Sequence, residues 1–301
     1  MNRWTANLLL LLAGAVWGMG FVAQSTGMDH LGPFSFIAIR FTIAALVVWP
    51  FAWRESTKST APIQNKLTTF GSFAVIGAVF FCGMAAQQVG LLTTSVSNSG
   101  FLTGLYVVFT PLVAVAFFRD WPHAVIWPAS LVALVGIFLL SGGDLAALVV
   151  GDFLTIASAF FWAIQTVLIG RFVIDSGRPI LLAATQFSVL ALCAWVVTLI
   201  RQEPISFEAV QGAGWELIYT GVFAGGFAFT LQVIGQRYTS ASQAVIFLAS
   251  EAPFAAIFAA IALGERIGVL GLAGCLCIVL AMLMVELVPE WMRRNAAVRS
   301  Q

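Results

Sequence analysis

Charged side chains are scarce in this sequence. They make up 9% of its 301 residues, whereas a soluble domain carries about 25%. Hydrophobic residues reach 60% and the mean hydropathy is +0.99, so the chain has more apolar surface than one aqueous core can bury. A soluble globular protein is therefore excluded, and the solvent of this chain has to be lipid. The near balance of 14 basic and 13 acidic residues also excludes the strongly basic surface of a nucleic-acid-binding protein.

Residues for catalysis or metal binding are also few. The four cysteines all lie inside apolar stretches and form neither a disulfide framework nor a zinc pattern. His30 and His123 are far apart in the sequence, and there is no HExxH, GxSxG or Gly-rich phosphate loop. We expect no metal, no cofactor and no catalytic residue, so the chain is predicted not to be an enzyme. Without an ATP site, transport driven directly by ATP would need a partner protein.

What the sequence does have is long apolar runs. A bilayer offers no hydrogen bonds to the backbone, so each crossing has to be a helix of about 20 apolar residues. The predicted fold is an all-α membrane protein with ten crossings, at residues 4–24, 33–53, 70–92, 97–118, 124–141, 153–170, 179–200, 216–236, 243–263 and 268–288. The ninth run is the least regular, because Glu251 and Pro253 interrupt it.

The basic residues predict the orientation of these crossings, since cytoplasmic loops are enriched in lysine and arginine. With a cytoplasmic N-terminus, the inner segments carry Arg3, Arg54, Lys58, Lys66, Arg119, Arg171, Arg178, Arg237, Arg293, Arg294 and Arg299. The outer loops carry Arg201 and Arg266, and Arg40 lies within a crossing. Both termini are therefore predicted to be cytoplasmic.

An internal repeat divides the chain. An offset of 145 positions relates Trp17 to Trp162, Gln87 to Gln232, Gly90 to Gly235, Thr94 to Thr239, Ser95 to Ser240 and Ser97 to Ser242. Further along, Pro111 matches Pro253 best at an offset of 142. We expect two units, residues 1–145 and 146–301, with five crossings each. Five is odd, so the second unit is predicted to enter the membrane from the opposite side, the inverted arrangement of many secondary transporters.

These residues also resemble a known family. The segments AGAVWG at 13–18, Arg40-Phe41, TTSVSNSGF at 93–101 and YTSASQAVIFLASEAPFAAI at 238–257 are similar to the EamA-type branch of the drug/metabolite transporter superfamily. The resemblance covers essentially the whole chain, and its most specific part is Thr239-Ser240-Ala241, Pro253 and Gly264-Glu265. The first half departs from the pattern, with Arg119-Asp120 and His123 where the second half has Gly264-Glu265.

The resemblance implies ten helices in two EamA repeats and the export or exchange of small metabolites across the bacterial inner membrane. Within the family, the length and the aromatic-rich crossings are most similar to the bacterial aromatic amino-acid exporters. We expect a monomer whose partners are a small-molecule substrate, such as an amino acid, and the lipid bilayer.

Glu251 is the ionisable residue that falls within a crossing of the second half. Phe247, Glu251, Phe254 and Phe258 share one helix face, which places the acid among aromatic rings. A carboxylate inside a membrane is costly and is a functional candidate by default. It is predicted to accept a substrate ammonium group or to couple transport to protons. The alternative is a protonated acid that hydrogen-bonds a neighbouring helix.

Arg40 is the corresponding cation, within the second crossing. Its guanidinium suits a substrate carboxylate, because it donates two parallel hydrogen bonds. It could equally snorkel to the membrane surface or hold two helices together. An ion pair of Arg40 with Glu251 is a further interpretation.

Polar and aromatic side chains line up on the faces of several other crossings. The stripes are Ser99, Thr103, Tyr106 and Thr110; Ser158, Trp162 and Gln165; and Tyr219, Phe223, Gly226 and Thr230, with Trp17 and Gln24, and Phe80 and Gln87, on two more. In lipid such stripes turn inward, either to bind substrate or to hydrogen-bond other helices. The predicted substrate-binding residues are Trp17, Phe80, Gln87, Thr103, Tyr106, Trp162, Gln165, Phe223, Phe247 and Glu251.

Together these features predict a secondary transporter that exports small metabolites, most of all aromatic or hydrophobic amino acids, by alternating access around a midplane site. Export of another metabolite or drug, a channel whose pore the polar stripes line, and a sensor that binds a ligand without moving it are the alternatives. The sequence leaves proton antiport and facilitated flux both open.

Overall fold

The computed structural model describes residues 1–58, 66–94, 96–140, 149–263 and 268–299, and every regular element in this part of the chain is a helix. Nine helical stretches there are long and apolar enough to cross a membrane: Arg3–Gly27, Pro33–Lys58, Leu67–Gly90, Ser99–Phe118, Val150–Ser176, Pro179–Arg201, Gly214–Gln236, Ala241–Phe258 and Val269–Pro289. The expected fifth crossing, 124–141, is represented by the shorter apolar helix Ile126–Leu140. An all-helical membrane protein is therefore confirmed. The Gly264-Glu265 pair lies outside the described residues.

Several of these stretches consist of more than one helix. The elements are α1 (Arg3–Gly18), α2 (Gly20–Gly27), α3 (Pro33–Lys58), α4 (Lys66–Gly90), α5 (Val96–Thr103), α6 (Tyr106–Phe118), α7 (Ile126–Leu140), α8 (Val150–Ser176), α9 (Pro179–Arg201), α10 (Phe207–Gly212), α11 (Gly214–Ile218), the π-helix η1 (Tyr219–Ala228), α12 (Phe229–Gln236), α13 (Ala241–Leu248), α14 (Glu251–Leu263) and α15 (Val269–Arg299).

Burial is reversed relative to a water-soluble protein. Large apolar side chains cover the outer surface, and Ile200 and Val269 are 75% and 84% exposed. Glutamines lie in the interior, where Gln88, Gln165 and Gln186 are fully buried. This pattern suits a chain whose outer surface faces hydrocarbon, because lipid solvates apolar side chains and leaves polar ones to find partners inside the protein.

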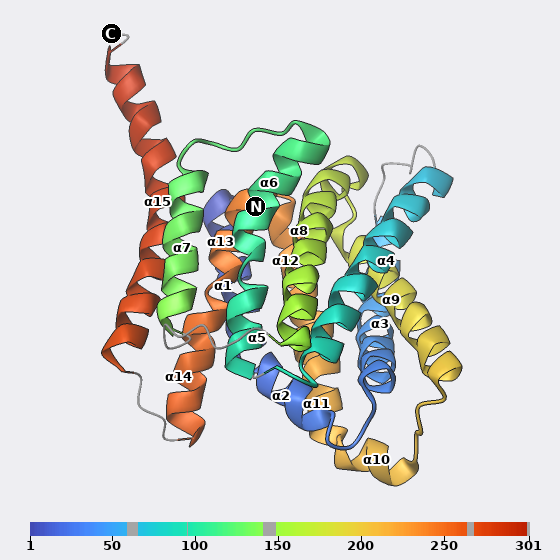
Figure 1. Cartoon of the computed structure of the whole chain (residues 1–301). Helices are drawn as coiled ribbons and strands as arrows, with labels where there is room; N and C mark the ends of the chain where they lie inside the picture. The colour runs from blue at the N-terminus through green and yellow to red at the C-terminus, as the bar shows by residue number, and fades with distance from the viewer. Residues whose placement is uncertain (59–65, 95, 141–148, 264–267, 300–301) are drawn as a thin grey trace.

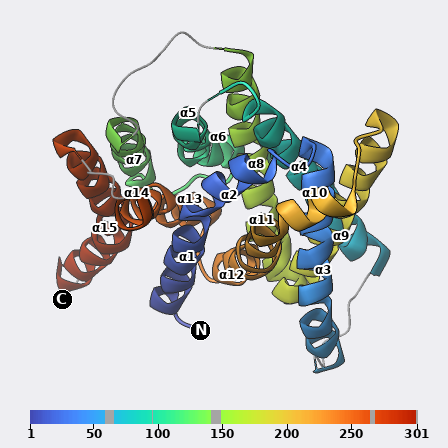
Figure 2. The ribbon, with the colours of Figure 1, turned by 90° about the horizontal axis from the view of Figure 1, so that it is seen from below.

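The helices form two flanking groups around a central one (Figure 1). Helix α7 packs along α15 at one edge, and α3 packs along α9 at the other, where α4 also lies. The central group contains α1, α6, α8, α12 and α13, and the view from below shows the same order (Figure 2).

The contacts between helices repeat when the two halves of the chain are exchanged. The α3–α9 and α7–α15 pairs each join corresponding crossings of the two halves. The contact of α4 with α8 has its counterpart in that of α12 with α1, and the contact of α6 with α8 has its counterpart in that of α14 with α1. Both halves therefore contribute matching sides to the central group.

The crossings predicted at 4–24 and 97–118 are present as membrane-length stretches, and each consists of two helices. The first is interrupted at Met19, between two glycines, and the second at Gly104 and Leu105. Glycine weakens a helix because its backbone loses the most freedom on folding. The ninth crossing is interrupted at Ala249 and Ser250, where Pro253 cannot donate a hydrogen bond to the carbonyl four residues earlier.

Glycines bring α1 into backbone contact with α14. A Cβ atom at Gly18 would lie 2.8 Å from the backbone nitrogen of Ala255, and one at Gly14 would meet the Ser250 side chain. Gly221 approaches the backbone carbonyl of Arg40 in the same way. Gly14 with Gly18, and Gly221 with Gly225, are GxxxG pairs that pack helices closely, as small residues do in membranes. At Gly100, which begins a third such pair, a Cβ atom would have nothing within 4 Å.

Two carboxylates clamp the α3–α9 pair at both ends. Glu203, just after α9, accepts hydrogen bonds from the backbone N–H of Ser35 (2.7 Å) and Phe34 (3.4 Å) at the start of α3. Glu55, near the end of α3, accepts hydrogen bonds from Leu181 (2.8 Å) and Ile180 (3.2 Å) at the start of α9. The first N–H groups of a helix have no partner within it, and negative charge there is stabilising. Each helix therefore caps the other.

We expect Glu203→Ala to lower the free energy of unfolding by about 1–2 kcal/mol, since it removes a helix cap. Thermal unfolding of the purified protein in detergent measures this loss. Asp29→Ala, which removes an exposed acid, is the matched control and should leave the melting temperature unchanged. Equal melting temperatures for Glu203→Ala and wild type would contradict the capping role.

Candidate functional site

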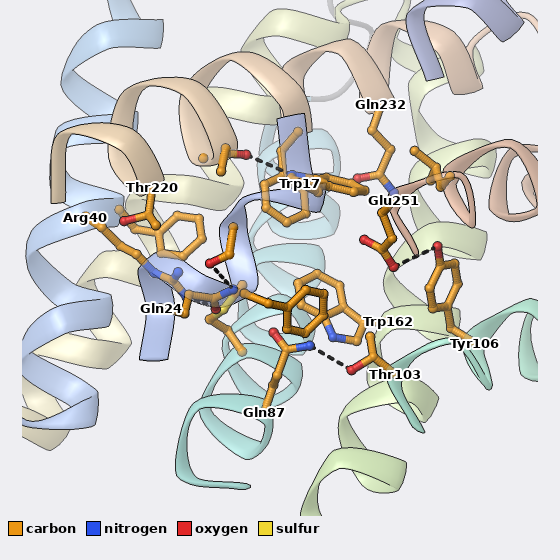
Figure 3. Close-up of a pocket in the computed structure, with 18 of the residues that line it drawn as sticks. Trp17, Gln24, Arg40, Gln87, Thr103, Tyr106, Trp162, Thr220, Gln232 and Glu251 are labelled. Atoms are coloured by element: carbon orange, nitrogen blue, oxygen red, sulfur yellow. Dashed lines mark hydrogen bonds between the residues drawn. The ribbon is translucent and has the colours of Figure 1, made fainter. Parts of the chain in front are cut away.

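A cavity of about 70 Å³ lies where the interrupted helices of the central group meet (Figure 3). This is well above the roughly 10–15 Å³ that one water molecule needs, and it limits what fits without side-chain movement to a small molecule or part of one. Its walls come from both halves of the chain, from α1 to α6 in the first half and from α8, η1, α12, α13 and α14 in the second.

Of the candidate residues from the sequence, the structure brings seven together around this cavity: Trp17, Arg40, Gln87, Thr103, Tyr106, Trp162 and Glu251. Three others are buried behind its wall. Phe80 is fully buried in a cluster of aromatic rings, Gln165 donates a hydrogen bond to Gln186 (3.2 Å), and Phe247 is packed among apolar side chains.

Phe223 lies apart from the cavity. Its side chain is 46% exposed and stacks on Tyr219. The predicted stripe assumed α-helical spacing, but residues 219–228 form a π-helix, in which each N–H bonds the carbonyl five residues earlier. The wider turn changes which residues face inward, so Thr220 and Ala224 line the cavity instead.

Other lining residues were not on the list of candidates: Gln24, Phe41, Met84, Thr166, Thr220, Phe229 and Gln232. The repeat offset could have indicated Gln232, as the counterpart of Gln87. Phe41, Met84 and Phe229 are ordinary apolar residues of apolar helices, and nothing in the sequence separates them from packing residues.

The lining residues follow the internal repeat. Six pairs on the cavity wall are 145 positions apart: Trp17 and Trp162, Phe21 and Thr166, Met84 and Phe229, Gln87 and Gln232, Thr103 and Leu248, and Tyr106 and Glu251. The two halves therefore place corresponding positions on one cavity.

Tyr106 and Glu251 also touch each other across the two halves. Each is the first residue of its helix after an interruption, in α6 and α14. The Tyr106 hydroxyl donates a hydrogen bond to Oε1 of Glu251 (3.4 Å). The offset of 145 residues therefore holds up to Tyr106 and Glu251. Pro111 and Pro253 are 142 residues apart, so the three extra residues of the first half lie between Tyr106 and Pro111.

Phe229 stands at the centre of the aromatic wall. Its ring centroid lies 4.4 Å from that of Trp17, 4.6 Å from Phe80 and 5.7 Å from Trp162, and it is stacked on the last of these. Such pairs add about 0.5–1.5 kcal/mol each beyond their burial. The Trp17 side chain is fixed further by a hydrogen bond from its Nε1 to the carbonyl of Ala224 (3.0 Å).

Arg40 is 3% exposed, and among the described residues no carboxylate lies within 4.0 Å of its guanidinium. Its Nη2 donates to Oε1 of Gln88 (3.2 Å) and contacts the Met84 sulfur. The rings of Phe36 and Phe41 lie 5.2 Å and 5.1 Å from its Cζ. Aromatic faces attract cations, but a buried charge is costly unless an opposite charge neutralises it. This end of the cavity therefore favours an anion.

Several amide and indole groups on the wall keep an atom free for a ligand. Gln24 donates to the carbonyl of Gly20 (3.2 Å) and Gln232 to the Thr166 hydroxyl (3.4 Å). The Oε1 atoms of both glutamines, and Nε1 of Trp162, are buried without a hydrogen-bond partner in the described structure. Buried polar groups normally have partners, so a bound polar molecule would complete these.

Membrane-length helices that enclose a partly aromatic cavity with a few converging polar groups define a multi-pass membrane protein with an internal cavity. The profile of the EamA-like transporter family matches residues 4–142 and, a second time, residues 149–287. The chain belongs to this family of transporters, as the sequence motifs predicted.

Individual proteins with similar sequences are also named as transporters. An uncharacterized transporter of Archaeoglobus fulgidus is 29% identical over 95% of this chain and 87% of its own length. A probable amino-acid metabolite efflux pump of Salmonella typhimurium is 26% identical over 61% of this chain, which spans 60% of that protein. A crystal structure aligns with 97% of this chain and 99% of its own, with a TM-score of 0.78 and 17% identity, and shows the fold alone.

We expect Arg40→Met to raise the melting temperature in detergent by about 2–4 °C, because it removes roughly 1 kcal/mol or more of uncompensated charge burial. Arg54→Met, which removes an exposed arginine, is the matched control and should give no rise. A lower melting temperature for Arg40→Met would mean that Arg40 holds helices together rather than awaiting a ligand.

Proposed function

We propose that this protein is a secondary transporter that exports small metabolites, most of all amino acids, through the cavity shared by its two halves. The observation that carries the proposal is a buried site with a cation at one end, a carboxylate at the other and aromatic rings between them. An amino acid has matching chemistry, with an anionic, a cationic and an apolar part.

In this proposal the chain crosses the membrane ten times, with α7 as the fifth crossing, and residues 1–145 and 146–301 form two inverted units. The exchange symmetry of the helix contacts and the six lining pairs at an offset of 145 support a two-fold relation between the units. Because each unit has an odd number of crossings, that relation inverts one unit relative to the other. The excess of arginine and lysine in the inner segments supports cytoplasmic termini, in the bacterial inner membrane.

Alternating access then depends on closing one end of the cavity at a time. At the proposed cytoplasmic end, Glu286 accepts hydrogen bonds from Asn7 (2.7 Å) and Gln243 (3.0 Å), and Arg3 lies 3.3 Å from the same carboxylate. These contacts join α1, α13 and α15. Removing a partner from such a buried network leaves an unpaired polar group, so the network favours the closed arrangement of this end.

The opposite end has a smaller network. The Thr94 hydroxyl donates to Asp152, whose other oxygen accepts a hydrogen bond from the backbone N–H of Val149 (2.9 Å). Asp152 is the repeat counterpart of Asn7, 145 positions later. We infer that these corresponding positions hold the two ends closed and that one set of contacts opens while the other stays formed.

The names of distant relatives agree with amino acids as the substrate class. The protein of Escherichia coli that is 26% identical over 61% of this chain is also a probable amino-acid metabolite efflux pump. The aromatic wall around Phe229 favours substrates with an apolar part, because it offers rings to the centre of the cavity.

Reconstitution into liposomes tests the proposal. We expect the purified protein to catalyse saturable, stereoselective exchange of labelled amino acids, with little competition from nucleosides or quaternary amines. Flux that does not saturate would indicate a pore, and binding without flux would indicate a sensor.

Glu251 is proposed to alternate between a proton and the substrate amine, because it faces the cavity with Tyr106 as its one described hydrogen-bond donor. We expect Glu251→Gln to make the flux independent of pH between about 5 and 8, since the amide does not titrate. Exchange in liposomes at several pH values measures this, with Glu208→Gln, an exposed acid outside the crossings, as the control. A pH profile identical to wild type would remove Glu251 from this role.

A further inference from the structure

The two charges of the cavity break its internal symmetry. Among the described lining residues, Arg40 and Glu251 are the charged ones. The position 145 residues after Arg40 is Thr185, and the position 145 before Glu251 is Tyr106. The cation thus belongs to the first half alone and the carboxylate to the second half alone, so a bound molecule has a fixed polarity.

The two charged groups lie apart. They form no ion pair within 4.0 Å, and they share no hydrogen-bond or ring partner in the described structure. Arg40 contacts Met84, Gln88 and two phenylalanine rings, whereas Glu251 bonds Tyr106. Figure 3 shows the side chain of Arg40 on one side of Trp17 and that of Glu251 on the other.

Aromatic rings line one wall of the cavity between them. The Arg40 guanidinium lies 5.1 Å from the Phe41 ring, Phe41 lies 6.3 Å from Phe229, and Phe229 lies 4.4 Å from Trp17. Gly18, the residue after Trp17, then contacts the backbone of Glu251, since a Cβ atom there would lie 3.0 Å from its carbonyl oxygen. Aromatic faces therefore form one wall between the two charges, and this wall suits methylene groups better than polar ones.

This geometry determines what can satisfy both ends at once. In an α-amino acid the nitrogen and the carboxylate carbon are attached to the same atom and are only about 2.5 Å apart. When the carboxylate of such a molecule binds Arg40, its ammonium group stays at that end of the cavity and leaves Glu251, on the other side of Trp17, unmatched. A molecule with the charges at opposite ends of a chain matches both.

We propose that the preferred substrates carry their carboxylate and their amine at the two ends of a short methylene chain, as ω-amino acids do. The carboxylate binds Arg40, the ammonium group binds Glu251, and the methylenes lie along Phe41, Phe229 and Trp17. This inference rests on the proposed transport of amino acids and narrows it to one class.

Isomers of identical composition provide the test. Exchange in liposomes is measured for 4-aminobutyrate against 2-aminobutyrate, and for 6-aminohexanoate against 2-aminohexanoate. We expect the ω-isomer of at least one pair to be half-saturating at about tenfold lower concentration, which corresponds to one charge-assisted hydrogen bond. The chain length with the larger preference measures the separation of the two charges.

A variant of Glu251 tests whether this residue causes the preference for the ω-isomer. In Glu251→Gln, which keeps an oxygen for Tyr106, the preference for the ω-isomer is expected to fall to about one. In Glu208→Gln the preference is expected to stay as in wild type. Gel filtration and the melting temperature show whether each variant is folded, and the rise in melting temperature with each isomer reports binding without transport.

The outcomes separate the two levels of the proposal. Transport of the α-isomers as good as or better than that of the ω-isomers overturns the charge-separation inference and leaves the transport of amino acids standing. The absence of transport and of any thermal shift with all four isomers overturns both. A preference for ω-isomers that persists in Glu251→Gln overturns the role of Glu251 as the amine site.

Discussion

The structure depends on one constraint: a chain in lipid has to satisfy its polar groups within itself. Hydrocarbon offers neither hydrogen bonds nor counter-charges, so Arg40, Glu251 and the glutamines of the crossings turn inward, while many large apolar residues face outward. The same constraint forms the cavity. Where the interrupted helices meet, several inward polar groups of the described structure retain an atom without a partner, and the proposed binding site lies there.

The sequence predicted the parts of this fold that depend on composition and periodicity. Apolar runs indicated the crossings, the offset of 145 indicated matching halves, and seven candidate residues meet on one cavity. It did not predict the interruptions at Met19 and Gly104 or the π-helix at 219–228. These features depend on packing between helices, and the π-helix turned Phe223 outward where α-helical spacing had placed it inward. Glycines occur in unbroken helices too, so sequence alone does not locate the breaks.

The residues that follow the internal repeat and the two charged residues that break it have different roles in the cavity. The paired tryptophans and the paired glutamines Gln87 and Gln232 give the cavity similar walls from both halves, which suits a transporter whose two ends have to open in turn. Arg40 and Glu251 have no charged counterpart in the opposite half. In the proposed transport, the similar walls suit a cavity that opens to either side, and the unequal charges favour one orientation of the substrate. A search for the internal repeat alone finds the similar walls and overlooks the unequal charges.

The reciprocal caps of α3 and α9 have a mechanical consequence. Glu55 and Glu203 join the start of each helix to the end of the other. Hydrogen bonds therefore hold the two helices together at both ends, and the pair resists bending. Such an antiparallel helix pair, which reaches from one membrane surface to the other, resists separation of its helices at one end alone. In the proposed alternating access, we expect the pair to tilt as one body, so that widening at one membrane surface narrows the other.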